Sequence, residues 1–215
     1  IISTGGISAS AKYIGKVGHP IAQFYGAIDD GLYSYDDFDV LTDGSYRLKA
    51  HLPSNGNVRT SIRPGDVKFK DLNGDLTITT LDVTVIGDPN PDFIGGFNNN
   101  FQYKGFDLNV FFQFSYGNDV LNMNKYKFCG GDVISLNTNV FAEYEDRWTV
   151  ENPNGKNPRL GGFGTLTVFP SRFIEDASFL RVKTVSLGYT IPSAILKSIS
   201  IKTLRVYCTA QNLYT

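Results

Sequence analysis

Residues 97–116 alternate between apolar and polar side chains with a period of two, which predicts β-strands. We expect two strands joined by a tight turn at Lys104 and Gly105. On the first arm, one face carries Phe97, Phe101 and Tyr103 and the other carries Asn98, Asn100 and Gln102. On the second arm, one face carries Phe106, Leu108, Val110, Phe112, Phe114 and Tyr116. The opposite face carries Asp107, Asn109, Gln113 and Ser115, with Phe111 as the exception.

The chemistry of these two faces favours a membrane strand. A spanning strand needs roughly 9–11 residues to cross about 25 Å of hydrocarbon, and the aromatic face is long enough to do so. The amide and carboxylate face suits a water-filled lumen. A strand of a soluble sandwich also alternates, but it buries mainly Val, Ile and Leu and exposes charged residues.

Residues 178–191 and 204–214 alternate in the same way and predict two further strands. In the first of them, one face carries Val185, Leu187, Tyr189 and Ile191, and the same period places Arg181 and Lys183 on that face. Its other face carries Thr184, Ser186, Gly188 and Thr190. In the second strand, Leu204, Val206, Cys208 and Ala210 alternate with Arg205, Tyr207, Thr209 and Gln211. Residues 192–202 are expected to form a short connection.

These patterns predict an all-β chain, an antiparallel transmembrane β-barrel portion with long extracellular loops. The strand hairpins 93–117 and 177–215 would alternate with two mainly extracellular loop regions, 1–92 and 118–176. In the loops we expect short strands at 22–28 and 32–35 and a short helix at 141–150. Short turns on one side and long loops on the other are typical of outer-membrane barrels.

Aromatic side chains in the second loop region have two interpretations. Amphipathic aromatics are favoured at interfaces, so Tyr126, Tyr144, Trp148 and Phe163 could contact a partner or cargo. The simpler expectation for any one of them is packing within the loops. For Trp148 we expect packing against the barrel rim.

Composition narrows the functional class. The formal net charge is −1 and the pI is about 6.1, so no basic surface for nucleic acid is expected. No apolar run is long enough for a transmembrane helix. This does not exclude a membrane barrel, because barrel strands are only half apolar. Cys129 and Cys208 lack metal-ligand spacing and are expected to stay unpaired. The chain opens at Ile1 without a signal peptide, which indicates a fragment or a processed piece.

The sharpest local motif is an acidic loop over residues 71–82. Oxygen-bearing side chains recur through it at Asp71, Asn73, Asp75, Thr77, Thr79 and Asp82. This spacing matches loops that wrap around Ca²⁺ with oxygen ligands, so these six residues are predicted to bind Ca²⁺. Leu76 stands where such loops prefer Gly, and Asp82 is shorter than the usual Glu. The alternative is an Asx-rich turn without an ion.

Longer runs of sequence resemble one known family. They are PGDVKFKDLNGD, TVIGDPNPDFIGGFNNNFQYKGFDLNVFFQFSYGNDVLN, RFIEDASFLRVKTVSLGYTIP and LRVYCTAQNLYT, preceded by VGHPIAQFYGAIDDGLY. Together they resemble the C-terminal part of the SusC/RagA-type TonB-dependent outer-membrane transporters. The resemblance covers the chain from about Lys16 to its end, and the chain departs from the family's acidic loop at Leu76.

The resemblance implies late strands of a large plugged barrel, of about 22 strands, in the outer membrane of a Gram-negative bacterium. It implies import of oligosaccharides or peptides under a surface lipoprotein lid of the SusD type. The TonB complex would drive import through an N-terminal plug region. The expected contacts are this lid, the cargo and outer-membrane lipid. The sequence contains no plug and ends before the last strand that the family would add.

Two other classes of function are open from the residues alone. A soluble calcium-dependent carbohydrate-binding β domain would use the aromatics as sugar platforms and would need no detergent. An enzyme is not expected, because His19 and His51 fall in predicted loops without a nucleophile motif. A glycosidase would need two carboxylates about 5–10 Å apart, and the sequence places no such pair.

Overall fold

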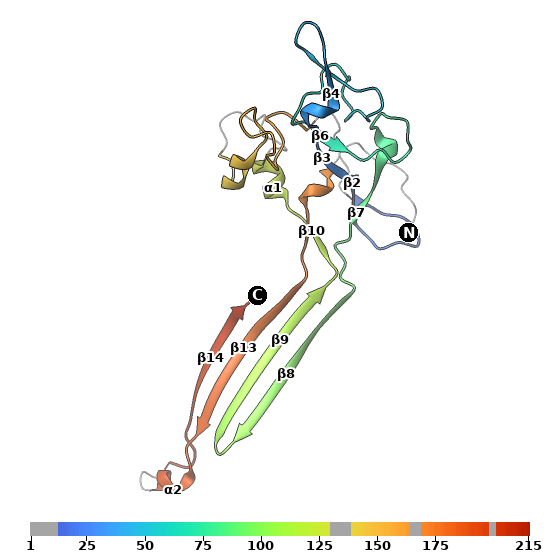
Figure 1. Cartoon of the computed structure of the whole chain (residues 1–215). Helices are drawn as coiled ribbons and strands as arrows, with labels where there is room; N and C mark the ends of the chain where they lie inside the picture. Colours follow the sequence, from blue (N-terminus) through green and yellow to red (C-terminus); the bar gives the residue numbers. More distant parts are fainter. Residues whose placement is uncertain (1–12, 130–138, 164–168, 198–200) are drawn as a thin grey trace. The chain divides into compact units, whose positions relative to one another are not determined.

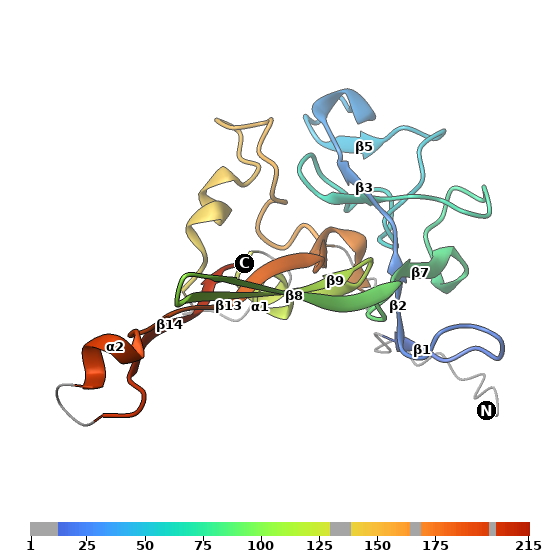
Figure 2. The same cartoon turned by 90° about the horizontal axis from the view of Figure 1, so that it is seen from below.

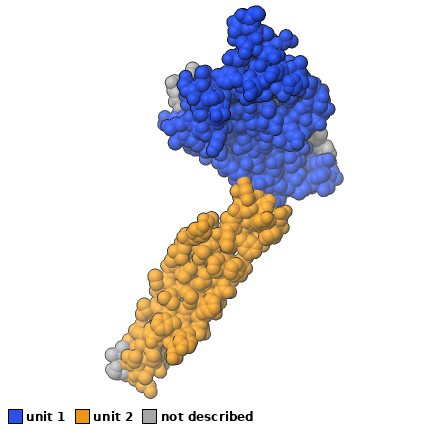
Figure 3. Space-filling view, in the orientation of Figure 1, with its two compact units in different colours: residues 1–90, 119–175 blue, residues 91–118, 176–215 orange. Residues whose placement is uncertain are grey.

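The computed structural model describes residues 13–129, 139–163, 169–197 and 201–215 (Figure 1). The chain divides into two compact units, residues 1–90 with 119–175 and residues 91–118 with 176–215 (Figure 3). The first unit is built from short strands and turns, and the second from one four-stranded sheet.

The sheet of the second unit contains the four long strands of the chain. They are β8 (Phe93–Tyr103), β9 (Phe106–Tyr116), β13 (Phe179–Thr190) and β14 (Arg205–Tyr214). Their order is β14-β13-β9-β8, and every neighbouring pair is antiparallel. Figure 2 shows the four strands as one layer. The predicted strand pairs at 97–116 and 178–214 are confirmed.

The turn between β8 and β9 has the backbone conformation that a two-residue hairpin needs. Lys104 has φ 45° and Gly105 has φ 86°, both in the left-handed region. Positive φ at both central positions is typical of type I′ turns, whose twist matches that of the flanking strands. The connection from β13 to β14 is longer and contains the helix α2 (Ser193–Leu196).

A β-bulge in β13 corrects one prediction about its faces. Val182 lies opposite Phe112 and Thr184 opposite Phe111, so Lys183 is an extra residue without a partner in β9. Arg181 therefore lies opposite Gln113 on the polar face, and its predicted place on the face of Val185 is wrong. A bulge adds one residue and so exchanges the faces of all positions beyond it. Here the exchange keeps Val182 and Val185 on the same apolar face.

The described residues of the first unit form four small sheets. In one, β2 (Gln23–Ala27) pairs antiparallel with β1 (Tyr13–Ile14) and β7 (Val83–Gly87), and parallel with β11 (Phe169–Pro170). The others pair β3 (Asp29–Leu32) with β6 (Val67–Phe69), β4 (Phe38–Val40) with β5 (Tyr46–Leu48), and β10 (Asp119–Leu121) with β12 (Ile174–Asp176). One α-helix, α1 (Met123–Phe128), and the 3₁₀ turns Tyr35–Asp37, Thr80–Asp82, Ala142–Asp146 and Ser171–Phe173 complete the described part of this unit.

Two predictions for the loop regions need correction. The strand expected at 32–35 is wrong, because β3 ends at Leu32 and the backbone N–H of Ser34 donates to the Asp37 carboxylate to begin a 3₁₀ turn. The helix expected at 141–150 is only the 3₁₀ turn Ala142–Asp146. It stops there because the N–H of Trp148 donates to the carbonyl oxygen of Asn157 and draws the chain into an extended conformation. The strand expected at 22–28 is confirmed as β2.

Two small hydrophobic cores hold the first unit together. One contains Ala27, Val67, Phe69, Ile78 and Val83. The other contains Tyr33, Phe38, Leu48 and Ile62. Both draw on positions far apart in the sequence, so these regions form folded structure and are not open loops.

Candidate functional site

One face of the four-stranded sheet is apolar along every strand. Its members are Phe93, Phe97, Phe101, Tyr103, Phe106, Leu108, Val110, Phe112, Phe114, Tyr116, Leu180, Val182, Val185, Leu187, Tyr189, Val206, Cys208, Ala210 and Tyr214. Gly95 and Asn99 interrupt it on β8. The predicted separation of Val110 and its apolar neighbours from Asn109 and Gln113 is confirmed.

Aromatic contacts are spread along this apolar face. Near the ends of the strands that lead to the first unit, the rings of Phe93 and Tyr116 stack at 5.0 Å. At the turn end, Phe106 lies 4.5 Å from Tyr189. Aromatic rows that flank an apolar band are typical of membrane barrels, where they mark the two interfaces. Strands of 11 residues, at about 3.3 Å per residue and roughly 45° tilt, span roughly 25 Å.

Two glycines of β8 are covered by aromatic rings from opposite faces. A Cβ added at Gly95 would lie 2.7 Å from Cζ of Phe114, and one at Gly96 would lie 3.0 Å from Cε2 of Phe111. Aromatic cover of this kind compensates for the weak packing of glycine in a strand. It also gives Phe111 a packing partner on a face that is mainly polar.

The opposite face is mainly polar, with Ile94, Phe111 and Phe179 as exceptions, and its polar side chains bond to one another. The Asn109 amide donates to Oδ1 of Asn98 at 2.8 Å and to Oδ1 of Asn100 at 2.6 Å. The hydroxyls of Ser186 and Thr209 lie 2.9 Å apart. Interstrand amide and hydroxyl bonds leave a surface that is compatible with water and that carries little net charge.

The acidic loop is closed by bonds from its own backbone. Asp71 accepts from the N–H groups of Gly74 at 2.7 Å and of Leu76 at 2.8 Å. Asn73 Oδ1 accepts from the N–H of Asp75 at 3.0 Å. Desolvation acts to raise the pKa of Asp71, but the backbone donors of Leu76 and Gly74 hold this pKa below its usual range. The loop therefore keeps an anionic, oxygen-rich turn.

The later members of the loop are tied down separately. Asp75 Oδ1 accepts from the N–H of Thr77 at 2.8 Å. Asp82 is fully buried, and its two oxygens accept from the N–H of Leu72 at 3.0 Å and of Thr79 at 2.8 Å. Within residues 13–129, 139–163, 169–197 and 201–215, no three His, Cys, Asp or Glu side chains form a cluster that could hold a metal ion. The six predicted ligands lie in one loop. Ca²⁺ binding by this loop stays a prediction.

Leu76 takes the conformation for which such loops prefer glycine. Its φ is 61°, in the left-handed region. Its carbonyl oxygen accepts from the N–H of Ser54 at 3.0 Å and from Arg59 Nη2 at 3.0 Å. The next residue but one, Ile78, is buried in the first core. These contacts compensate for the unfavourable backbone of Leu76 and fix the loop to its unit.

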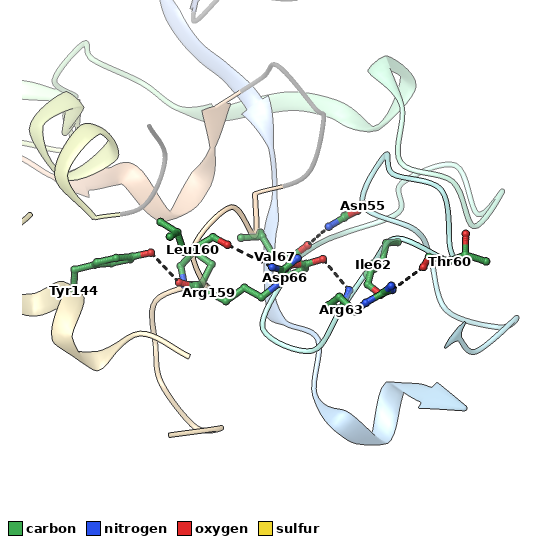
Figure 4. Close-up of polar contacts among 10 residues, drawn as sticks. Asn55, Thr60, Ile62, Arg63, Asp66, Val67, Tyr144, Arg159 and Leu160 are labelled. Carbon is green, nitrogen blue, oxygen red and sulfur yellow. Dashed lines mark hydrogen bonds and ion pairs between the residues drawn. The ribbon is translucent and has the colours of Figure 1, made fainter. Parts of the chain in front are cut away.

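A buried ion pair, which the sequence analysis did not identify, joins two segments of the first unit (Figure 4). Asp66 is 1% exposed and accepts from Arg159 Nε at 2.5 Å and from the N–H of Arg63 at 2.9 Å. Burial raises the pKa of Asp66, although the Arg159 bond opposes the shift. The backbone reinforces the junction, since the N–H of Arg159 donates to the carbonyl oxygen of Gly65 at 3.0 Å. No local signal marks a pair this distant in sequence.

The loop aromatics pack inside the first unit. Tyr144 and Trp148 are 3% and 9% exposed, and an added Cβ at Gly65 would lie 2.4 Å from the Trp148 ring. Tyr126 and Phe163 both contact the Phe173 ring. Packing within the loops is therefore the interpretation that the contacts favour, and Trp148 covers Gly65 within the first unit. Its packing against the barrel rim stays a prediction.

The state of the two cysteines and the length of the helices bear on two further expectations. Cys129 and Cys208 are both free thiols, as predicted. Burial, followed by the bond to Glu143, raises the pKa of Cys129 to about 12. In the described part of the chain, no helix combines the length and apolar character required to cross a membrane.

Similarity to known proteins is extensive but covers only part of each relative. No family model matches the sequence. The chain is 35% identical over 200 residues to TonB-dependent receptor P3 of Formosa agariphila, covering 93% of the chain and 18% of the relative. It is 38% identical over 173 residues to TonB-dependent receptor P26 of the same organism, covering 79% of the chain and 17% of that relative. It shares 30% identity over 152 residues with TonB-dependent receptor SusC of Bacteroides thetaiotaomicron, covering 70% of the chain and 14% of that relative.

A solved structure shows the same relation at the level of the fold. The structure of the RagAB peptide transporter superposes with a TM-score of 0.62 at 26% identity, covering 94% of this chain and 20% of that chain. The chain thus spans about a fifth of the length of the proteins that it matches.

Proposed function

The chain is recognised by sequence and by fold as a portion of a SusC/RagA-type TonB-dependent transporter, and we propose that it forms part of the wall of an outer-membrane barrel that imports nutrients. The observation that carries this proposal is the two-faced sheet β14-β13-β9-β8, with one apolar side and one amide-bearing side. In the proposed wall the apolar side would face lipid and the amide side would face the lumen. The role is passage and not catalysis, in keeping with relatives that are named as receptors and transporters.

The proposed cargo is an oligosaccharide or a peptide, and the proposed partners follow from the relatives. One structural neighbour is described as the RagAB peptide transporter, and one sequence relative is named SusC. By analogy, a surface lipoprotein of the SusD/RagB type would cover the barrel, and the TonB complex would act on a plug region elsewhere in the transporter. The long segments of the first unit would face outward, where lid and cargo arrive.

The orientation of the chain gives the first prediction. A protease site inserted between Thr42 and Asp43, at the tip of the β4–β5 hairpin, should be cut when protease is added to intact cells. The same site inserted between Lys104 and Gly105 should be cut only after the outer membrane is permeabilised, because short turns of such barrels face the periplasm.

The matched pair of insertions also provides the control. Both tips are exposed turns between two neighbouring antiparallel strands, so accessibility in detergent should be similar. The assay is run with and without the lid lipoprotein, since a lid could shield the outer site. Cleavage of the Lys104 site on intact cells, with the Thr42 site protected even in the lid-free strain, would reverse the proposed orientation.

We also propose that the acidic loop binds Ca²⁺ and braces a loop outside the membrane. What supports this is the donor set, since Asp71, Asn73, Asp75 and Asp82 offer side-chain oxygens, with a backbone oxygen of Thr77 and Thr79 directly or through water. The left-handed Leu76 already supplies the sharp turn. In this role the ion would take no part in chemistry and would only order the loop.

Calorimetry on the chelator-treated transporter tests the calcium proposal. Added Ca²⁺ should bind one site that is lost in the Asp71→Asn, Asp75→Asn double variant, because two of its hard ligands lose their charge. Asp43→Asn, at an exposed turn of the same unit, should leave binding unchanged. If the unmodified protein and the double variant give the same heats at millimolar Ca²⁺, the loop is an Asx-rich turn without an ion.

A further inference from the structure

The register of β14 is not set by its connection to β13. A tight hairpin turn fixes strand register, but the segment from Ile191 to Leu204 is long and includes α2. At the far end the pairing is interrupted as well, with a register shift between Val182 and Thr184. Asn212 has φ 53°, so β14 is irregular at that point too. The regular ladder runs from Thr184 to Thr190, with one further backbone bond from the N–H of Ile191 to the carbonyl oxygen of Leu204.

The side-chain pattern of β14 leaves a two-residue slip open. Val206, Cys208 and Ala210 lie on the apolar face, and all three would return to that face after a shift of two residues in either direction. Cys208 and Ala210 are small, so they offer little shape by which one register could be distinguished from the next. Something else must select the observed pairing.

An ion pair between β14 and β9 crosses β13 at Gly188, which has no side chain. Arg205 of β14 lies opposite Thr190, but its guanidinium passes over Gly188 to Asp107 of β9. Nε bonds to Oδ1 at 2.9 Å and Nη2 to Oδ2 at 2.5 Å. A Cβ at Gly188 would lie 2.6 Å from both Nη2 of Arg205 and Oδ1 of Asp107. The contact therefore requires glycine beneath it.

Tyr207 completes the arrangement. It lies directly opposite Gly188, and the Arg205 guanidinium lies 5.1 Å from its ring centroid. A slip that moves Arg205 past Thr190 takes the guanidinium away from Asp107. A slip in the other direction brings Arg205 opposite Gly188, still beside Asp107, so the ion pair does not oppose that slip. It brings Tyr207 opposite Ser186, whose side chain already occupies the polar face.

We propose that the Arg205–Asp107 pair, seated over Gly188, holds β14 in register against the slip that would carry Arg205 past Thr190. A bidentate arginine–carboxylate pair has defined geometry as well as charge, which suits it to select one alignment among several with equal hydrophobic pattern. Its role is in assembly of the wall and does not depend on the identity of the cargo.

The natural Cys208 allows register to be read directly. It faces Leu187 in the observed pairing, so Leu187→Cys should form a disulfide with Cys208 in the full transporter in outer membranes. Tyr189→Cys and Val185→Cys would report slips of two residues in the two directions, because each would then face Cys208. Linked peptides are identified by mass spectrometry. In the unmodified background, the position 187 crosslink should dominate.

Loss of the ion pair should redistribute the crosslinks. Arg205→Met is expected to raise the ratio of the position 189 crosslink to the position 187 crosslink about fivefold, which is what a partly exposed pair supports. Asp107→Asn, nearly isosteric with the native residue, should do the same and serves if Arg205→Met yields no folded protein. The exchange Asp107→Arg with Arg205→Asp should restore the native ratio.

A control pair separates register selection from general damage to the polar face. Ser186→Ala with Thr209→Val removes a contact between the same two strands, and it should leave the crosslink ratio unchanged. An unchanged ratio in folded Arg205→Met or Asp107→Asn protein would overturn the proposal. So would an equal shift in the Ser186, Thr209 control.

Discussion

Val110→Arg should lower the free energy of unfolding of the transporter by about 2–4 kcal/mol, whereas Asn109→Arg should leave the fold intact. Val110 lies at the centre of β9 on the apolar face, opposite Val185. A cation there would be held in hydrocarbon. Asn109 is its neighbour in sequence but faces the polar side, where a new side chain can reach water. Urea titration of the protein folded in lipid vesicles measures both.

The two variants control for each other, since they place the same residue at adjacent positions of one strand. Asn109→Arg removes two amide bonds, which should cost only about 1 kcal/mol in a polar setting. Equal destabilisation at both positions would mean that neither face is dry, and the membrane assignment of the sheet would fail.

Arg159→Met should destabilise the first unit by about 2 kcal/mol at neutral pH, and lowering the pH should recover much of this loss. Arg159 is the cation that faces the buried Asp66 carboxylate. Without it the Asp66 charge remains buried, compensated by the backbone N–H and the more distant charge of Arg63. Arg159 itself is a third exposed, which keeps the expected loss below that of a fully buried pair. Thermal unfolding between pH 5 and 7.5 measures the effect.

The sign of the pH dependence follows from the direction of the Asp66 shift. Burial raises the pKa of Asp66 in the folded state, so the folded protein binds this proton more tightly than the unfolded chain does. The contribution of protonation to stability is then greatest at low pH and is lost as pH rises through the folded pKa. Removing Arg159 raises that pKa further and makes the loss at neutral pH larger.

The double variant Asp66→Asn, Arg159→Met is the control for this prediction. It leaves no titrating group at the junction, so the pH dependence of the single variant should disappear while the packing change remains. A single variant whose stability loss is the same at pH 5 and pH 7.5 would show that Asp66 charge is not what Arg159 compensates.

Strict alternation of apolar and polar residues made the sheet predictable. The predicted face of Arg181 was wrong because of a β-bulge. Residues 97–116 combine a period of two with a two-residue turn at Lys104 and Gly105, so strands, turn and faces could all be read locally. Arg181 was misplaced because one extra residue, Lys183, reverses the parity of everything before it. Nothing in the local sequence distinguishes that residue from its neighbours.

The first unit was less predictable because its contacts are distant in sequence. The parallel pairing of β2 with β11 joins Gly26 to Phe169, and Arg159 bonds to Asp66 across 93 residues of sequence. Such pairs have no periodicity to reveal them. The acidic loop is intermediate in predictability, because the spacing from Asp71 to Asp82 predicted the turn. In the structure, the same oxygens that could ligate an ion accept backbone N–H groups.

Spin labels at Val110→Cys and Asn109→Cys, in the transporter reconstituted in lipid, test the membrane-wall account most directly. Oxygen dissolves in hydrocarbon, while a water-soluble nickel chelate does not, so relative collision rates report which medium each side chain meets. A label at position 110 should collide mainly with oxygen and a label at position 109 should be shielded from it. Equal oxygen access at both positions, or greater access at position 109, would contradict the assignment of the apolar face to lipid.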